Sequence, residues 1–257
     1  SKSGNTIETL ANTFLLKILK KKAKNIIIIS EKENFLHTLS RKLNLFHIEH
    51  NAMIGGRFSV LSEVGLVPLY LMGLNIRKLR SKILDNLKNT NKTRMVNDTI
   101  NLAQSLKSQN KNNLILLNYS PELEKFLFWL QQLIAESLGK DNKGFLPIIS
   151  SAPKDHHSLL QLYLDGPRDK IFNIFSLDKI SKEKINVSKT FGVKSFLDKK
   201  RISKVKNAQK NALIKTLLKK KIPFREFKIK NINEEELGKL FSFFMIETVI
   251  IGKILKI

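Results

Sequence analysis

The stretch Asn113–Ser120, NLILLNYS, decides the fold of this 257-residue chain. Its apolar run is short and does not alternate with polar residues, which is typical of a strand buried on both faces of a parallel sheet. Ser120 at its end is a candidate helix N-cap, and Pro121 suits the first helical position. The stretch therefore predicts a buried strand that leads into a helix, which should run to about Ser137.

The same pattern continues in both directions from this strand. Further short apolar strands are predicted at residues 25–30, 145–151, 170–177 and 223–229. Helices are predicted at about 7–21, 35–45, 61–74, from 156 onward, 203–219 and 233–254, with NTNKTR (89–94) as a loop. Buried strands that alternate with helices predict an α/β fold, with parallel sheets flanked by helices on both faces. Ligands of such sheets bind at the carboxyl ends of the strands.

The composition argues against several classes of partner. Lys and Arg number 46 against 22 Asp and Glu, a net charge of +24. These basic residues are scattered and lack the interleaved aromatic rings of a single-strand binding surface, so no nucleic-acid partner is expected. The chain has no Cys, which rules out disulfides and thiolate metal sites and fits a reducing compartment. No apolar run reaches the roughly 18–20 residues of a membrane span, so we expect a soluble, cytoplasmic protein without a membrane partner.

The opening segment SKSGNTIET (1–9) has the features of a phosphate-binding turn. Asn5, followed three residues later by Glu8, is a helix-start signature. The N-terminus of a helix carries a partial positive charge and favours a bound phosphate. The hydroxyl and ammonium groups in this segment could bind the same phosphate, and they belong to Ser1, Lys2, Ser3 and Thr6. The alternative is an ordinary Ser/Gly loop that caps a helix.

Arg57 is the first candidate for catalytic chemistry. It follows Gly55 and Gly56 in the segment IGGRFSVLSEVGL (54–66), just before a predicted helix. Two glycines allow a sharp turn, which would aim the guanidinium into a cleft. The alternative is an exposed arginine in a loop.

Gln132 and Glu136 form a second candidate site on the helix after residue 120. They are four residues apart, so they share one helix face. The opposite face is an apolar stripe that should pack in the core: Leu123, Phe126, Leu127, Leu130, Leu133 and Ile134. The alternative is a solvated surface glutamate. Phe128 and Trp129 flank the polar strip, which suggests that Glu136 lies in a partly dry cleft, where a carboxylate can serve as a general base.

Two adjacent histidines, His156 and His157, begin a predicted helix in DHHSLLQLYLDGP (155–167). A histidine at a helix start is in most cases a capping or surface residue.

These segments together resemble the glucose-6-phosphate isomerase family. SKSGNTIET resembles the phosphate-binding Ser-x-Ser-Gly-x-Thr turn of sugar-isomerase (SIS) domains. IGGRFS resembles the family's Gly-Gly-Arg-Tyr/Phe-Ser signature, and residues 132–140 resemble its Gln-(x)3-Glu-Ser-x-Gly-Lys motif. DHHSLLQL resembles Gln-His-Ser/Ala-x-x-Gln-Leu, with His156 in place of the Gln. The four motifs keep the family's order, span nearly the whole chain and look more like its bacterial branch.

The resemblance implies two SIS-type α/β domains, the first of them incomplete. Residues 1–77 would be the C-terminal part of the first, residues 78–112 a helical connection, and residues 113–257 the second. The implied reaction interconverts glucose 6-phosphate and fructose 6-phosphate, in glycolysis and gluconeogenesis, without a metal or cofactor. Glu136 would shuttle the C1/C2 proton and Arg57 would stabilise the enediolate. His157 would open the sugar ring in the neighbouring subunit's site, which implies a homodimer.

The resemblance also leads us to expect that both ends of the family's chain are missing. The family continues past the last helix into a tail with a catalytic lysine, and Lys253 and Lys256 do not match it. We therefore expect low activity from this chain alone. Three alternatives stay open: another SIS-type isomerase, a non-catalytic sugar-phosphate-binding regulator, and a nucleic-acid-binding protein.

Overall fold

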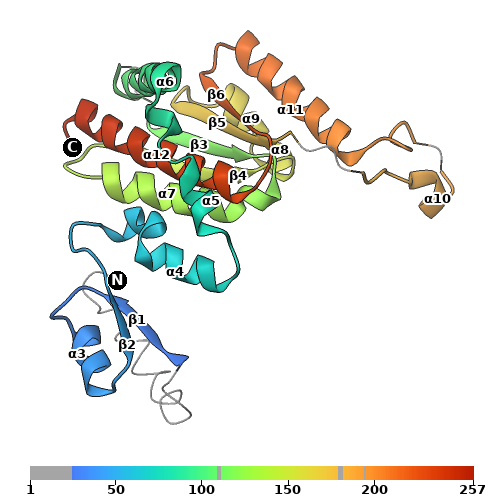
Figure 1. Ribbon diagram of the computed structural model, residues 1–257. Coiled ribbons are helices and arrows are strands. Elements are labelled where there is room, and N and C mark those ends of the chain that lie inside the picture. The colour runs from blue at the N-terminus through green and yellow to red at the C-terminus, as the bar shows by residue number, and fades with distance from the viewer. Residues whose placement is uncertain (1–24, 109–110, 179–181, 194) are drawn as a thin grey trace.

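The computed structural model describes residues 25–108, 111–178, 182–193 and 195–257. Within them the chain forms two separate parallel sheets (Figure 1). The first sheet pairs β1 (Ile27–Ser30) with β2 (Phe46–Glu49), and α3 (Phe35–Lys42) connects them. The strand β2 was not predicted from the sequence, because it has only four residues and none of them is fully buried.

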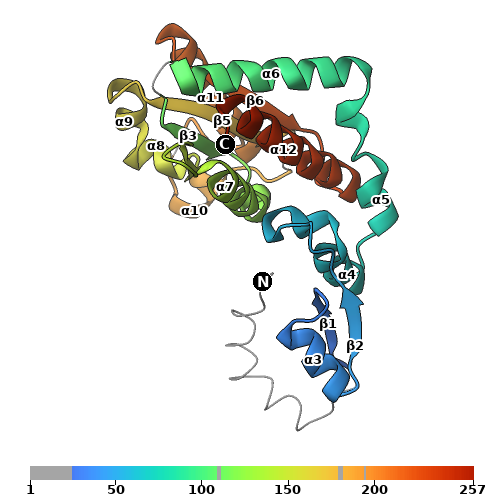
Figure 2. The same cartoon turned by 90° about the vertical axis from the view of Figure 1, so that its left-hand side faces the viewer.

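The segment between the two sheets is helical. Its elements are η3 (Gly56–Leu61), α4 (Glu63–Leu71), α5 (Ile76–Ser81), η4 (Asp85–Leu87) and α6 (Asn89–Ser108). The prediction of a loop at residues 89–94 is wrong, because these residues form the first turns of α6, an uninterrupted helix in Figure 2. Their polar side chains are exposed, and the buried stripe of α6 begins only at Met95. The sequence of this exposed first part of the helix lacks apolar residues, and for that reason it was predicted to be a loop.

The second sheet contains four parallel strands in the order β4-β3-β5-β6. They are β3 (Asn113–Asn118), β4 (Leu146–Ser151), β5 (Lys170–Leu177) and β6 (Phe224–Ile229). The helices that connect and cover them are η5 (Pro121–Leu123), α7 (Glu124–Leu138), α8 (Lys154–Ser158), α9 (Leu160–Asp165), α10 (Val187–Phe191), α11 (Ile202–Lys219) and α12 (Glu234–Leu255). The predicted fold class, α/β with parallel sheets flanked by helices, is confirmed.

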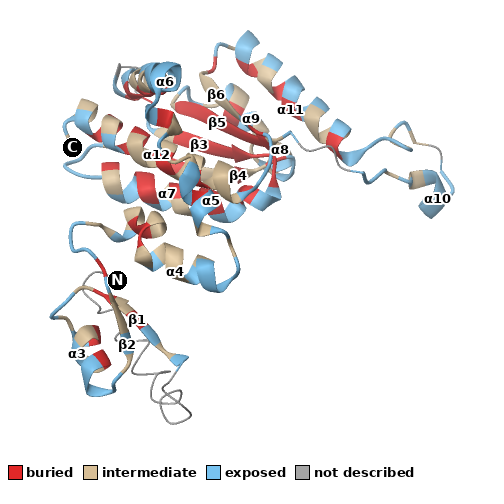
Figure 3. Ribbon diagram, viewed as in Figure 1, coloured by how far each residue is buried: buried red, intermediate tan, exposed pale blue. Residues whose placement is uncertain are grey.

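The core lies on both faces of the second sheet, whose central strands are buried (Figure 3). Along β3, Leu114 and Leu116 face a cluster with α6, α7 and α12, whereas Ile115 and Leu117 face a cluster with α9 and α11. This alternation follows from the two-residue period of a strand. The predicted apolar stripe of α7 is confirmed, since all six of its residues are buried in the first cluster.

The turn after β3 differs from the predicted helix cap. Ser120 makes no capping hydrogen bond, and Pro121 begins the 3₁₀ turn η5, so α7 starts at Glu124. The Ser120 hydroxyl instead accepts a hydrogen bond from the backbone N–H of Leu177 at 2.8 Å. The Ser120 hydroxyl therefore bonds the end of β5 rather than a backbone N–H of the helix that follows it.

The connecting helices place the first sheet relative to the second. The turn η3 packs against α7 and α12, and α5 and α6 pack against α12. The segment that contains Arg57 is thereby laid across α7. The domain boundaries at residues 77 and 112 stay predictions. Among the described residues, no helix is long and apolar enough to span a bilayer.

Candidate functional site

The Gly55-Gly56-Arg57 segment forms the start of η3. Gly55 has φ −67° and ψ 149°, an extended conformation that any residue adopts, and neither glycine has a positive φ, so the backbone here does not require glycine's conformational freedom. A Cβ atom on Gly56 would meet nothing within 4 Å, and one on Gly55 would lie 4.0 Å from Arg57 Nη1. A side chain at position 55 would therefore come into contact with the guanidinium, whereas position 56 faces open space.

Arg57 reaches the last turns of α7. Its Nε donates to Ser137 Oγ at 2.7 Å, and its Nη1 lies 3.7 Å from Glu136 Oε2. Its backbone carbonyl accepts a hydrogen bond from Trp129 Nε1 at 3.0 Å. The guanidinium carbon also lies 5.3 Å from the centre of the Phe58 ring, within cation–π range. Three of these contacts, to Ser137, Glu136 and Trp129, hold Arg57 against the helix that carries Glu136.

Glu136 and Gln132 interact as their spacing predicts. Gln132 Nε2 donates to Glu136 Oε1 at 2.8 Å. The predicted partly dry setting is wrong for the described residues, because the Glu136 side chain is 48% exposed. Trp129 packs inward against Phe241, at 4.7 Å between ring centres, and therefore does not shield the carboxylate. Phe128 is itself half exposed.

The two adjacent histidines of α8 have different surroundings. His157 is exposed, whereas His156 Nε2 lies 2.8 Å from the hydroxyl of Tyr119, which is buried. Burial lowers the pKa of His156 and raises the pKa of Tyr119. His156 is thus a structural partner of Tyr119, and His157 is the histidine that faces outward.

The structure brings Arg57, Gln132 and Glu136 together, but it does not bring His157 to them. Glu136 lies near the end of α7, and His157 lies beyond the carboxyl end of β4. The helix runs back from the carboxyl edge of the sheet for the twelve residues from 124 to 136, roughly 18 Å at about 1.5 Å per residue. The cluster around Arg57 is therefore at the amino edge of the second sheet, not at the carboxyl ends that the general rule for such sheets predicts.

The carboxyl edge of this sheet holds only a small pocket among the described residues. The hydrogen bond between Ser120 and Leu177 bridges the ends of β3 and β5. A pocket of about 150 Å³ remains beside it, lined by Glu122, Leu177, Lys230, Asn231 and Ile232. This is below the roughly 300 Å³ of a typical small-molecule site.

The remaining predicted binding residues cannot be placed. Ser1, Lys2, Ser3 and Thr6 lie outside the described residues. Within the described part of the chain, no group of His, Cys, Asp and Glu side chains could hold a metal ion. Sequence reasoning did not identify Ser137 and Trp129 as contacts of Arg57. Their only signal was their position on the same helix as Glu136.

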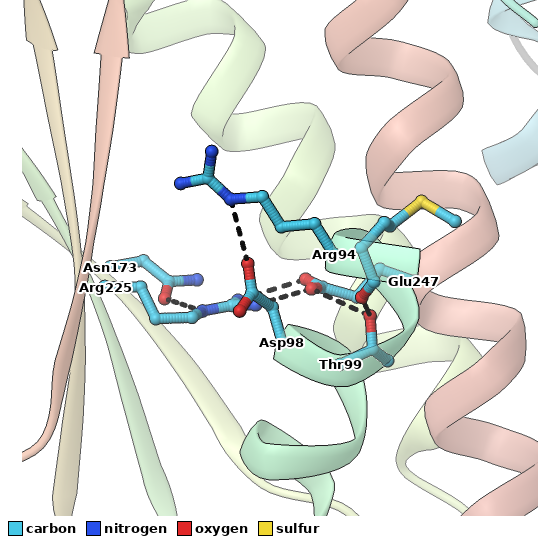
Figure 4. Close-up of polar contacts among 7 residues, drawn as sticks. Arg94, Asp98, Thr99, Asn173, Arg225 and Glu247 are labelled. Atoms are coloured by element: carbon cyan, nitrogen blue, oxygen red, sulfur yellow. Dashed lines mark hydrogen bonds and ion pairs between the residues drawn. The ribbon is translucent and has the colours of Figure 1, made fainter. Parts of the chain in front are cut away.

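A second arginine–glutamate pair provides a contrast (Figure 4). Arg225 on β6 binds Glu247 on α12 through two hydrogen bonds, of 2.5 and 3.1 Å, and its Nε donates to Asn173 at 3.0 Å. Glu247 is buried and also accepts from Thr99. Glu247 is 4% exposed and Arg225, which lines a neighbouring pocket, is 17% exposed. This pair is fully hydrogen-bonded and structural, whereas the Glu136 carboxylate of the other pair is 48% exposed.

Comparison with known proteins gives a consistent family. The chain is 32% identical over 99% of its length to a probable glucose-6-phosphate isomerase from Methanococcus maripaludis, and covers 59% of that protein. It is 31% identical over its whole length to a glucose-6-phosphate isomerase from Methanocaldococcus jannaschii, and covers 65% of that protein. The chain thus spans about three fifths of the length of these curated relatives. No protein-family model matches it.

Solved structures agree on the fold. A hypothetical protein from Thermus thermophilus superposes with a TM-score of 0.84 at 25% identity, over 99% of this chain and 65% of that one. A glucose-6-phosphate isomerase from Chlamydia trachomatis superposes with a TM-score of 0.70 at 20% identity, over 98% of this chain and 53% of that one.

Proposed function

We propose that this chain, which is homologous to part of the glucose-6-phosphate isomerases, carries the proton-transfer site of an aldose–ketose isomerase acting on glucose 6-phosphate and fructose 6-phosphate. The observation that carries the proposal is the pairing of Arg57 with Glu136. Packing of η3 against α7 places a cation 3.7 Å from an exposed carboxylate that lies far from it in sequence.

The chemistry needs one base and one cation. From fructose 6-phosphate, the Glu136 carboxylate would remove a proton from C1, so that a C1–C2 double bond forms and the carbonyl electrons move to the C2 oxygen. Arg57 would stabilise that oxygen as its negative charge develops, which is where a fixed cation accelerates such reactions most. The hydroxyl proton on O1 would pass to O2, which leaves the negative charge on O1. Glu136 would then return the proton to C2 as the C1 oxygen becomes the carbonyl. Because the substrate's own carbonyl makes the proton acidic, the proposed step uses no cofactor.

Two further groups would orient the reactants. Gln132 already donates to Glu136 Oε1, which leaves Oε2 as the oxygen nearer to Arg57. Ser1, Lys2, Ser3 and Thr6 would hold the phosphate, and thereby set the register of the sugar chain relative to Glu136. An SIS-type fold for both domains, with the division at residues 77 and 112, is part of this proposal.

His157 would act on the site of a second subunit. It is exposed and lies at the opposite end of α7 from Glu136 in its own chain. A ring-opening role therefore requires a homodimer in which His157 of one subunit approaches Glu136 of the other. A cytoplasmic location and a place in glycolysis and gluconeogenesis would follow from this activity.

The test is the isomerisation of fructose 6-phosphate by the protein expressed from its complete gene. Glu136→Gln should lower kcat by at least about 10²-fold, the usual cost of losing a general base. Glu124→Gln is the matched control, since it makes the same change in the first turn of the same helix, and it should retain activity.

The outcomes are distinct. Wild-type turnover that is lost only in Glu136→Gln supports the proposal. Sugar-phosphate binding without turnover in any of the proteins would overturn it and favour a non-catalytic regulator. Equal activity in both variants would show that another residue is the base.

A further inference from the structure

The orientation of Arg57 is not set by Glu136. Among the described residues, the hydrogen bond that the guanidinium donates is the one from Nε to Ser137 Oγ, at 2.7 Å. The 3.7 Å between Nη1 and Glu136 Oε2 is too long for a hydrogen bond. Ser137 therefore holds the guanidinium, and Glu136 only faces it.

Ser137 also differs from three other hydroxyl residues within the helices. Such side chains commonly donate back to the carbonyl four residues earlier. Thr99, Ser105 and Thr216 all do so, at 2.7, 2.8 and 2.9 Å. For Ser137, the described residues show no such bond, and its oxygen accepts from Arg57 instead. The hydroxyl is thus directed away from its own helix and toward the arginine.

The backbone of Arg57 is fixed by the same helix. Trp129 Nε1 donates to the Arg57 carbonyl at 3.0 Å, and the Trp129 ring is anchored by Phe126 and Phe241. The helix α7 therefore holds the arginine at its carbonyl and at its Nε, and it also carries the carboxylate that the arginine faces.

We propose that Ser137 is a positioning residue for Arg57, an inference that rests on the proposed isomerase function. By engaging Nε, Ser137 leaves the two Nη atoms on the side of Glu136 without letting them close onto it. The Arg225–Glu247 pair shows the closed alternative, in which two hydrogen bonds occupy both carboxylate oxygens. Closure of that kind at Arg57 would occupy both the base and the cation that the substrate needs.

The experiment measures kcat and KM for fructose 6-phosphate in Ser137→Ala, Ser137→Thr, Arg57→Ala and the double variant Arg57→Ala/Ser137→Ala. A hydrogen bond to a charged group is lost in Ser137→Ala, so kcat should fall by about tenfold, with KM changed little. Ser137→Thr keeps the hydroxyl and should recover most of kcat. The double variant should be no slower than Arg57→Ala alone, because Ser137 acts through Arg57.

Three results would overturn the proposal: wild-type kcat in Ser137→Ala, multiplied losses in the double variant, or no recovery in Ser137→Thr. Ser105→Ala is the control for the loss of a helix hydroxyl elsewhere, and it should leave kcat unchanged. Failure of the proposed function is a separate outcome, because it is measured with a different variant. If Glu136 is not the base, Glu136→Gln will stay active, whichever result the Ser137 variants give.

Discussion

The two ends of α7 differ in how completely their polar groups are paired. In the loop just before its first turn, Ser120 accepts a hydrogen bond from the end of β5, and Tyr119 bonds His156 on α8. At its last turns, Arg57 faces a Glu136 that is half exposed, at a distance that leaves both groups available. Satisfied polar groups make the first end rigid. The incomplete pairing at the other end leaves charges free to bind and react.

This difference also explains why the site is not where sheet topology predicts it. At the carboxyl edge of the second sheet, the hydrogen bond from Leu177 to Ser120 joins the ends of β3 and β5, and the pocket beside it holds only about 150 Å³. At the amino edge, η3 brings a segment that lies before the sheet in sequence onto the end of α7. The candidate site is thus made by packing between two parts of the chain rather than by the loops of one sheet.

The largest effect should come from removing the cation at the open end. Arg57→Ala should lower kcat by about 10²–10³-fold, the usual range for removing one group that stabilises a developing oxyanion. Arg57→Lys should fall between this variant and wild type, because lysine keeps the charge but cannot reach Ser137 and Glu136 with one planar fork. Steady-state kinetics on fructose 6-phosphate would measure both.

The control for this prediction is Arg94→Ala, which removes an arginine whose side chain is 86% exposed on α6. It should leave kcat unchanged. Equal losses in Arg57→Ala and Arg94→Ala would mean that general positive charge, not the placement beside Glu136, supports the activity.

A smaller effect should separate the two histidines at the closed end. His157→Gln should lower kcat by roughly 10²-fold, at the low end for a general acid–base group. His156→Gln should keep kcat within about threefold of wild type, because His156 is engaged with Tyr119 and does not face outward. His156→Gln and His157→Gln make the same substitution at adjacent positions, so each variant serves as the control for the other. A greater loss in His156→Gln would reverse the assignment.

The smallest effect concerns stability and pH. Burial lowers the pKa of His156 from its ordinary value of 6.5. The unfolded chain then takes up a proton on this histidine at a higher pH than the folded chain does. The stability that neutral His156 contributes is therefore fully present above about pH 6.5, and it is lost as the pH falls through the pKa of the folded state. The free energy of unfolding should therefore decrease less between about pH 8 and about pH 5 in His156→Gln than in wild type.

Urea unfolding at the two pH values would test this prediction, with His157→Gln as the control that keeps the wild-type dependence. Identical pH dependence in all three proteins would show that burial does not keep His156 neutral.

Local patterns in the sequence predicted most of the second sheet. The predicted strand at residues 170–177 coincides with β5, because an apolar run of that length can be satisfied only by burial on both faces. The stripe on α7 was equally clear. Predictions failed where a distant residue or solvent exposure determined the structure. Ser120 accepts a hydrogen bond from Leu177 instead of capping a helix. The polar residues 89–94 form the exposed start of α6 instead of a loop.

Contacts within one helix of the candidate site were predictable from the sequence, whereas contacts between distant segments were not. The contact between Gln132 and Glu136 follows from a spacing of four residues on a helix. The contact between Arg57 and Ser137 joins residues 80 apart in sequence and depends on how η3 packs on α7. Which of two adjacent histidines turns inward likewise depends on a distant residue, Tyr119.

The central claim, that Glu136 moves a proton between C1 and C2 beside Arg57, is tested most directly by converting fructose 6-phosphate in D₂O. The label at C2 of the glucose 6-phosphate product would be measured by NMR. Wild type should incorporate deuterium, because a protonated carboxylate at a site this exposed exchanges with solvent between removing the proton and returning it, and Glu136→Gln should give neither product nor label. Labelled product formed by Glu136→Gln at the wild-type rate would contradict the claim.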